Sequence, residues 1–285
     1  MNKEKYYYQV EIGFTKKTYE DVLNILYRLG INQILETDNS FILYFTEAER
    51  EKETLLARCI FDNELIKNNL YDLKKLKNQD WDKNWKKSIK PVFIKDKIIV
   101  YPSWLKKSIE KFKKRILIEI DPKMSFGTGH NETTQLVLEQ MCDFWEEKNK
   151  KILDFGCGTG VLAIAGLKLG AKKLIAIDTD KDSIDNAKEY FEINNVKNLI
   201  KLHRKTISEL KESNFDVVLA NILRNVIEEN LTYIYKKLKI NGKLFISGIL
   251  NTEDELISKA LINQGFNIID KRYKAEWIGF YAIKK

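Results

Sequence analysis

Short apolar runs alternate with helical periodicities over the second half of the chain. The runs RILIEID, KILDFG, KLIAID, LIKLH, FDVVLAN and GKLFISGI are typical of strands, and helical spacing of apolar residues occurs at 132–146, 160–169, 180–195 and 224–237. Strands that alternate with helices indicate an α/β fold, a Rossmann-like and mostly parallel sheet with helices on both faces. The last segment, FNIIDKRYKAEWIGFYAIK, predicts two strands without a helix between them, hence an antiparallel last hairpin.

The first part of the chain predicts a separate small α+β unit. Apolar residues alternate with polar ones at 6–14, a helix with Thr18 as its cap ends at Gly30, and strands near 33–37 and 41–45 precede a helix at 47–69. This order favours a ferredoxin-like domain. We expect a domain at 1–77, and a second at 78–285 that begins with a linker and a hairpin at 92–101.

A glycine cluster, DFGCGTG, lies between a predicted strand and a predicted helix. Gly156, Gly158 and Gly160 follow the GxGxG spacing, whereas a dinucleotide-binding loop has GxGxxG and would need glycine at Val161. No Gly-Lys-Ser/Thr follows, so the loop is not a phosphate-binding P-loop. Glycines allow a ligand to approach the backbone, and the start of the helix is expected to offer free N–H groups to an anionic group.

The pattern DxGxGxG resembles that of class I S-adenosylmethionine-dependent methyltransferases. In such a protein Asp154 would orient the loop and help to fix the amino group of the cofactor. Asp178 ends the next strand, where a carboxylate can accept both hydrogen bonds of a ribose diol. Asn221, Ile222 and Leu223 follow a third strand, at the edge where ligands of such sheets bind.

A second glycine segment, SFGTGHNETT at 125–134, precedes this loop. It lies between a strand and a helix, so it can fold over a cofactor from the opposite side, with Gly127 and Gly129 allowing close approach. Asn131 or Thr133 would cap the helix, and Thr134 would point toward the methionine end of the cofactor. The alternative is an ordinary flexible lead-in to a helix.

Five stretches together resemble one family closely, the ribosomal protein L-eleven (L11) methyltransferases of PrmA type. They are WDKNWKKSIKPVFIKDKIIVYPSW, DPKMSFGTGHNETT, KILDFGCGTGVLAIAGLKLGA, AIDTDKDSIDNAKEYFEINNV and VVLANIL, and they cover roughly 80–225. The resemblance implies a substrate-recognition domain at 1–77 and a protein N-methyltransferase that modifies lysine and N-terminal amines of L11 with S-adenosyl-L-methionine. The implied cofactor-binding residues are Phe126, Gly127, Thr133, Thr134, Asp154, Gly156, Gly158, Gly160, Asp178 and Asn221, and the implied catalytic residues are Asn221, Ile222 and Leu223. It assigns no role to His130.

The charge distribution keeps other functions open. Residues 65–115 hold 16 Lys or Arg against 5 Asp or Glu, in a chain of net charge +8. This segment suggests contact with rRNA or a ribonucleoprotein, although a lysine-rich composition with solvated side chains explains it equally well. An RNA methyltransferase of the same fold, or a non-catalytic S-adenosylmethionine-binding protein associated with RNA, therefore stays an alternative.

Cysteine and histidine content argue against other classes of site. Three scattered cysteines without a CxxC pair indicate reduced thiols, and two distant histidines do not suggest a metal site. The sequence contains no apolar run of membrane-spanning length and no signal peptide. We therefore expect a cytoplasmic monomer with no membrane contact.

Overall fold

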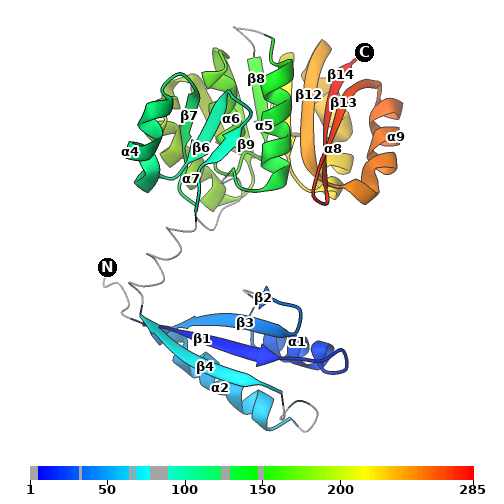
Figure 1. Cartoon of the computed structure of the whole chain (residues 1–285). Coiled ribbons are helices and arrows are strands. Elements are labelled where there is room, and N and C mark those ends of the chain that lie inside the picture. Colours follow the sequence, from blue (N-terminus) through cyan, green and yellow to red (C-terminus); the bar gives the residue numbers. More distant parts are fainter. Residues whose placement is uncertain are drawn as a thin grey trace. The chain divides into compact units, whose positions relative to one another are not determined.

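The computed structural model describes residues 6–31, 34–63, 66, 69–77, 89–122, 129–146 and 151–285. The chain forms two compact units, residues 1–89 and 90–285, which we describe separately (Figure 1). The assignment of residues 1–77 to substrate recognition stays a prediction. No helix in the described ranges is both long enough and apolar enough to span a bilayer.

The first unit has the predicted ferredoxin-like arrangement. Its elements are β1 (Tyr6–Gly13), α1 (Tyr19–Arg28), β2 (Leu35–Glu36), β3 (Ser40–Thr46), α2 (Arg50–Phe61) and β4 (Tyr71–Lys77). The sheet has the order β2-β3-β1-β4, and its pairs are antiparallel. The sequence did not predict β4, because this edge strand, YDLKKLK, exposes Lys74 and Lys75 and lacks clear apolar alternation. The predicted helix at 47–69 is also too long, since α2 ends at Phe61.

The second unit contains a seven-stranded sheet of order β10-β9-β8-β11-β12-β14-β13. Its strands are β8 (Lys151–Phe155), β9 (Lys173–Asp178), β10 (Ile200–Arg204), β11 (Phe215–Asn221), β12 (Leu238–Leu250), β13 (Phe266–Lys274) and β14 (Trp277–Lys284). Strands β8 to β12 pair in parallel, whereas β14 is antiparallel to both β12 and β13. This confirms the predicted parallel sheet and its antiparallel last hairpin.

Helices cover both faces of this sheet. The helices are α5 (Glu132–Phe144), α6 (Val161–Lys168), α7 (Lys181–Ile193), α8 (Arg224–Lys237) and α9 (Asp254–Gln264), of which the sequence did not predict α9. Successive residues of β8 belong to the hydrophobic cores on opposite faces of the sheet, because side chains alternate across a strand. Ile152 packs with residues of α5, α6 and α7, and Leu153 packs with residues of α8 and α9.

A separate three-stranded sheet precedes this core. Strands β5 (Val92–Ile94) and β6 (Ile98–Tyr101) form the predicted hairpin, and β7 (Ile116–Glu119) pairs with β6 in parallel. The sequence placed RILIEID in the main parallel sheet, and that prediction is wrong. One face of the small sheet packs on the core of α5 and α6, and the other is covered by α4 (Lys106–Ile109) and the flanking 3-10 turns.

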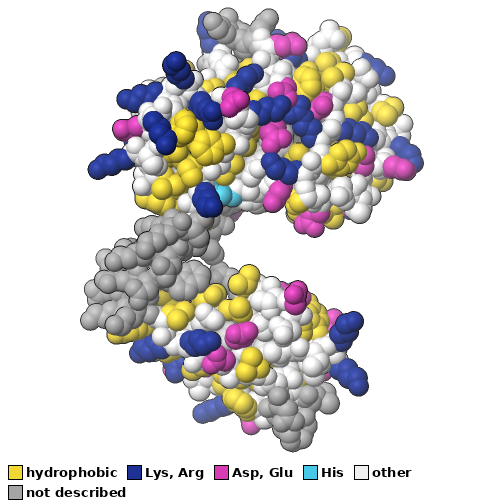
Figure 2. All heavy atoms as spheres, viewed as in Figure 1, with side chains coloured by type: hydrophobic (Ala, Val, Ile, Leu, Met, Phe, Trp, Pro, Cys, Tyr) yellow, Lys and Arg dark blue, Asp and Glu magenta, His cyan; other side chains and the backbone are white. Residues whose placement is uncertain are grey.

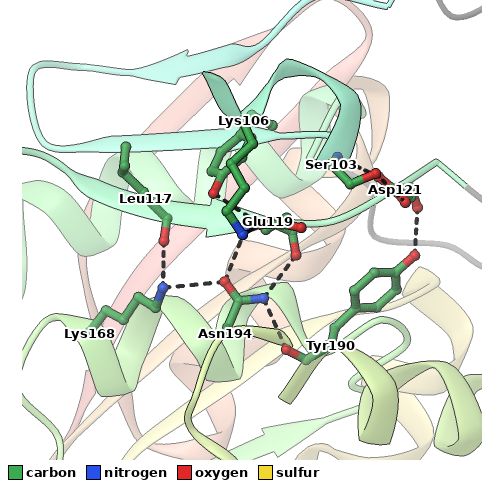
Figure 3. A network of polar contacts seen from close by, with 9 residues as sticks. Ser103, Lys106, Leu117, Glu119, Asp121, Lys168, Tyr190 and Asn194 are labelled. Carbon is green, nitrogen blue, oxygen red and sulfur yellow. Dashed lines mark hydrogen bonds and ion pairs between the residues drawn. The ribbon is translucent and has the colours of Figure 1, made fainter. Parts of the chain in front are cut away.

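A polar network fixes the end of β7 against α6 and α7 (Figure 3). The Asn194 amide accepts from the Glu119 N–H at 2.9 Å and donates to the Glu119 carbonyl oxygen at 2.8 Å. The Tyr190 hydroxyl donates to the carbonyl oxygen of Asp121 at 2.8 Å. The Lys168 ammonium donates to the side-chain oxygen of Asn194 at 3.2 Å, and burial lowers its pKa. The backbone from β7 to Asp121 is therefore held by side chains of α6 and α7 and of Asn194, which directly follows α7.

Candidate functional site

A cavity of about 680 Å³ lies where β8, β9, β10 and β11 end. Seven residues that the sequence predicted as site residues lie on its wall: Thr133, Gly156, Gly158, Asp178, Asn221, Ile222 and Leu223. They come from α5 and from the segments that follow β8, β9 and β11. The carboxyl ends of parallel strands meet at one edge of the sheet, which brings these distant segments together.

Glycine is required in the DFGCGTG loop mainly by packing inside the protein. Gly156 has φ +71°, and a Cβ at this position would lie 2.3 Å from Cγ2 of Ile222. Gly160 has φ +79°, and a Cβ there would lie 2.2 Å from the ring of Phe191. Gly160 begins α6 and does not line the cavity, so its role as a cofactor contact stays a prediction.

The backbone donors of this loop are used within the protein. The N–H groups of Gly156 and Cys157 donate to the carbonyl oxygen of Ile177 at 2.9 and 3.1 Å. The Gly158 N–H donates to Oδ2 of Asp178 at 2.9 Å. The N–H groups at these three positions are therefore not free for a ligand, and the expectation of free N–H groups at the start of α6 stays a prediction. Gly156 and Gly158 line the cavity, and the bonded N–H groups of the loop do not form a phosphate cradle.

Asp178 is held rigidly at the cavity wall. Its Oδ2 accepts from Gly158, and its Oδ1 accepts from the backbone N–H of Asp180 at 3.0 Å. Each carboxylate oxygen has a second lone pair, so both remain able to accept a further hydrogen bond. Two fixed acceptors side by side match the spacing of a vicinal diol.

Asn221 presents an acceptor without a partner in the described part of the chain. Its Nδ2 donates to the hydroxyl oxygen of Thr134 at 3.0 Å, while its buried Oδ1 has no partner there. Thr134 is fully buried and does not line the cavity, although Thr133, whose hydroxyl also lacks a described partner, does. The geometry thus gives Thr134 the position of a residue that orients the amide of Asn221.

Asp154 lies beneath the site. Its side chain is 1% exposed, and its Oδ2 accepts from the N–H of Ala163 in the first turn of α6 at 3.0 Å. Burial raises the pKa of Asp154 to about 7. The carboxyl group does not line the cavity, so its contact with the amino group of the cofactor stays a prediction.

The first glycine segment is described from residue 129 onward, and Phe126 and Gly127 lie outside the described residues. Nε2 of His130 lies 3.0 Å from the carbonyl oxygen of Lys90. Asn131 occupies the cap position of α5 and lines the cavity, but its side chain makes no capping hydrogen bond. The predicted side-chain cap is therefore wrong for Asn131.

Other residues of the wall were not predicted. The most polar of them, together with one indole, are Glu132, Ser183, Lys205, Thr206, Asn230 and Trp277. Lys205 and Thr206 directly follow β10, so the same rule that selected Asp178 applied to the strand LIKLH would have found them. Asn230 and Trp277 lie on α8 and at the start of β14, where local sequence gives no sign of the cavity.

Comparison with known proteins identifies the family. The chain matches the family model of ribosomal protein L11 methyltransferase (PrmA) over residues 6–285. The chain belongs to this family. A ribosomal protein L11 methyltransferase of Prochlorococcus marinus (strain AS9601) is 38% identical over 222 residues, which are 76% of this chain and 73% of the relative.

Two further relatives support the same family. The ribosomal protein L11 methyltransferase of Alkaliphilus oremlandii (strain OhILAs) is 29% identical over 302 residues, covering 94% of this chain and 96% of the relative. The crystal structure of a ribosomal protein L11 methylase from Lactobacillus delbrueckii subsp. bulgaricus superposes with a TM-score of 0.64 at 28% identity. It covers 69% of this chain and 100% of that structure.

The cofactor of this methyltransferase is S-adenosylmethionine, and the wall of the cavity fits it. The cofactor combines a ribose diol with two cationic centres, an ammonium and a sulfonium. The carboxylate of Asp178 on the described wall can accept the ribose diol, and the N–H groups of Gly156, Cys157 and Gly158 are not the free donors that a pyrophosphate requires. Asn221 lies on the same wall, with its Oδ1 buried and without a partner in the described ranges.

Proposed function

We propose that this chain transfers methyl groups from S-adenosylmethionine to ribosomal protein L11, and that the accepting groups are lysine side chains and the N-terminal amine. Membership of the family supports the reaction and the protein substrate. The observation that carries the proposal for the site is the acceptor-rich cavity, where Asp178 and Asn221 face a common space. The choice of amines rests on the resemblance of the sequence motifs.

Asp178 is the residue we assign to the ribose. Its two oxygens are fixed by Gly158 and Asp180 and keep one acceptor site each. Such a carboxylate does not need to reorganise when it accepts two hydroxyl groups, so binding costs little conformational entropy. When bound, the cofactor supplies an electrophilic methyl group attached to its sulfonium sulfur.

Asn221 is the residue we assign to an amine in the cavity. Thr134 fixes its amide, which leaves Oδ1 as an acceptor for an N–H group. An amide oxygen holds a neutral amine in one orientation without a change in its own charge, which suits alignment of the acceptor amine. Alignment is the main requirement of a displacement with a good leaving group.

The segment Asn221–Leu223 is fixed by two glycines. The side chain of Ile222 packs on Gly156, and a Cβ at Gly248, which has φ +90°, would lie 2.2 Å from the carbonyl oxygen of Ile222. No larger residue fits at either position without a shift of this segment. The close packing supports the proposal that the segment determines where the substrate amine lies.

Deprotonation of a lysine amine, with a usual pKa near about 10.4, needs no side-chain base in this proposal. Of the described residues on the wall, the ionisable ones are Glu132, Asp178 and Lys205. The two carboxylates attract a cationic amine to the cavity. Transfer into an apolar part of the wall then favours the neutral amine, and its proton passes to water.

The test is a transfer assay with labelled S-adenosylmethionine, purified L11 and rRNA, followed by mass spectrometry of the L11 peptides. We expect label in L11 and none in RNA. Asp178→Asn should weaken cofactor binding by roughly tenfold, since it replaces one acceptor of a charged hydrogen bond. Asp182→Asn is the matched control, because Asp182 lies in the first turn of α7 outside the cavity wall.

Label in RNA would support the alternative of an RNA methyltransferase, and cofactor binding without turnover would support a non-catalytic binding protein. Equal affinity of Asp178→Asn and the wild type would contradict the assignment of the ribose site. The monomeric state and the contact of residues 65–115 with rRNA stay predictions.

A further inference from the structure

A strong local excess of positive charge lies in one short segment of the second unit. Residues 90–115 contain nine Lys or Arg against two Asp or Glu, an excess of seven in a chain whose net charge is +8. A lysine-rich composition alone would distribute this excess along all 285 residues. Overall composition therefore does not explain why the basic residues cluster in this segment.

The structure places this segment on the small sheet and the turns that cover it. Lys111, Lys113 and Lys114 are exposed, and none of them forms an ion pair within the described ranges. By contrast, Lys106 pairs with Glu119 at 2.9 Å. Figure 2 shows dark blue basic side chains around a yellow hydrophobic area over β6, β7 and α4.

Two aromatic rings lie among these cations. Phe93, on the edge strand β5, is 48% exposed, and its ring meets that of Phe112 edge to face with centroids 5.6 Å apart. The guanidinium of Arg115 lies 5.8 Å from the Phe93 centroid and 5.4 Å from the Phe112 centroid. The Lys111 ammonium lies 5.1 Å from the Phe112 centroid. A half-exposed ring is thus held in place by a second ring and a planar cation.

We propose that this basic-aromatic patch, formed by Phe93, Lys111, Phe112, Lys113, Lys114 and Arg115, binds single-stranded RNA. Unpaired lysines neutralise successive phosphates, and the fixed ring of Phe93 stacks on a base. An acidic protein segment would satisfy the lysines but would leave the exposed ring without a planar partner. The patch is separate from the methyl-transfer cavity, so the inference goes beyond the proposed function and does not depend on it.

The test uses the full chain and a fluorescein-labelled uridine 12-mer, with binding measured by anisotropy over a series of salt concentrations. The variant Lys111→Ala/Lys113→Ala/Lys114→Ala removes three cations. If each neutralises one phosphate of a single strand, the slope of log K against log salt falls by about 2. The control Lys211→Ala/Lys236→Ala/Lys259→Ala removes three exposed lysines elsewhere in the second unit and should leave affinity and slope unchanged.

A second variant separates stacking from charge. Phe93→Ala should weaken RNA binding roughly tenfold without a change in the salt slope, because loss of a stacked base affects no phosphate contact. Phe93→Tyr should retain binding, since a phenol ring still stacks. All variants should bind S-adenosylmethionine and methylate free L11 as the wild type does, which shows that they are folded and distinguishes failure of this inference from failure of the proposed function.

Three results would overturn the proposal. They are no RNA binding by the wild type at low salt, equal losses in the patch variant and the control variant, and an unchanged affinity in Phe93→Ala. Competition by a polyglutamate peptide as strong as that by unlabelled RNA, with no effect of Phe93→Ala, would assign the patch to an acidic protein.

Discussion

Asp154, on β8, has a side chain that is almost completely buried and that contacts the first turn of α6. Burial raises its pKa from 3.8 to about 7, the hydrogen bond from Ala163 opposes this, and the charge of Asp178 adds to it. The difference between the two pKa values corresponds to about 4 kcal/mol of unfavourable free energy when the group is ionised in the folded chain. Asp154→Asn removes the ionisation and keeps an acceptor for Ala163.

The direction in which stability changes with pH follows from proton binding by Asp154 in the folded and unfolded chain. Between about pH 4 and pH 7 the folded chain retains the proton of Asp154 and the unfolded chain has lost it, so the free energy of unfolding falls as the pH rises through this window. Above the folded pKa both states are ionised and the dependence ends. From about pH 5 to pH 8, Asp154 should therefore lower the stability of the wild type by about 2 to 3 kcal/mol.

The assay is urea denaturation of the wild type and of Asp154→Asn at a series of pH values. Unfolding is monitored by far-ultraviolet circular dichroism. Subtraction of the two curves cancels the other titrating groups. We expect the stability advantage of Asp154→Asn to grow by about 2 to 3 kcal/mol between about pH 5 and pH 8. A difference that stays constant over this range would refute the argument that burial raises this pKa.

Three further substitutions test the packing and the polar contacts around the site. Gly160→Ala should lower the free energy of unfolding by about 2 to 4 kcal/mol, since it strains a left-handed backbone and overlaps Phe191, and Phe191→Leu in the same chain should restore part of the loss in denaturation experiments. Thr134→Val should lower the rate of methyl transfer to L11 about tenfold at saturating cofactor, because the amide that aligns the acceptor amine, Asn221, loses its hydrogen-bond acceptor, whereas Thr134→Ser should keep the rate of the wild type. Asn194→Ala should cost about 2 to 3 kcal/mol and speed hydrogen exchange in β7, and unchanged exchange there would contradict the role of the network in Figure 3.

The sequence by itself determined the parallel sheet with its last hairpin and seven residues of the cavity wall. The central strands β8, β9 and β11 are buried on both faces, so each appears in the sequence as a compact apolar run. Because ligands bind at the carboxyl ends of parallel strands, the last residues of such runs, including Asp178 and Asn221, were predictable from position alone. Elements with weaker local patterns were missed, as in the exposed edge strand β4.

Only the tertiary structure decided what depends on contacts between distant segments. The apolar pattern of RILIEID is the same in either sheet, and packing on α5 and α6 assigns it to the small one. The sequence pattern of the glycine loop does not say where its N–H groups bond, and in the fold Ile177 and Asp178 accept those of Gly156, Cys157 and Gly158. Trp277 reaches the cavity because β14 returns antiparallel beside β12. Residue types and their spacing restrict the local backbone. The partner of each polar group depends instead on which strands lie next to each other, and this is decided by the packing of the whole core.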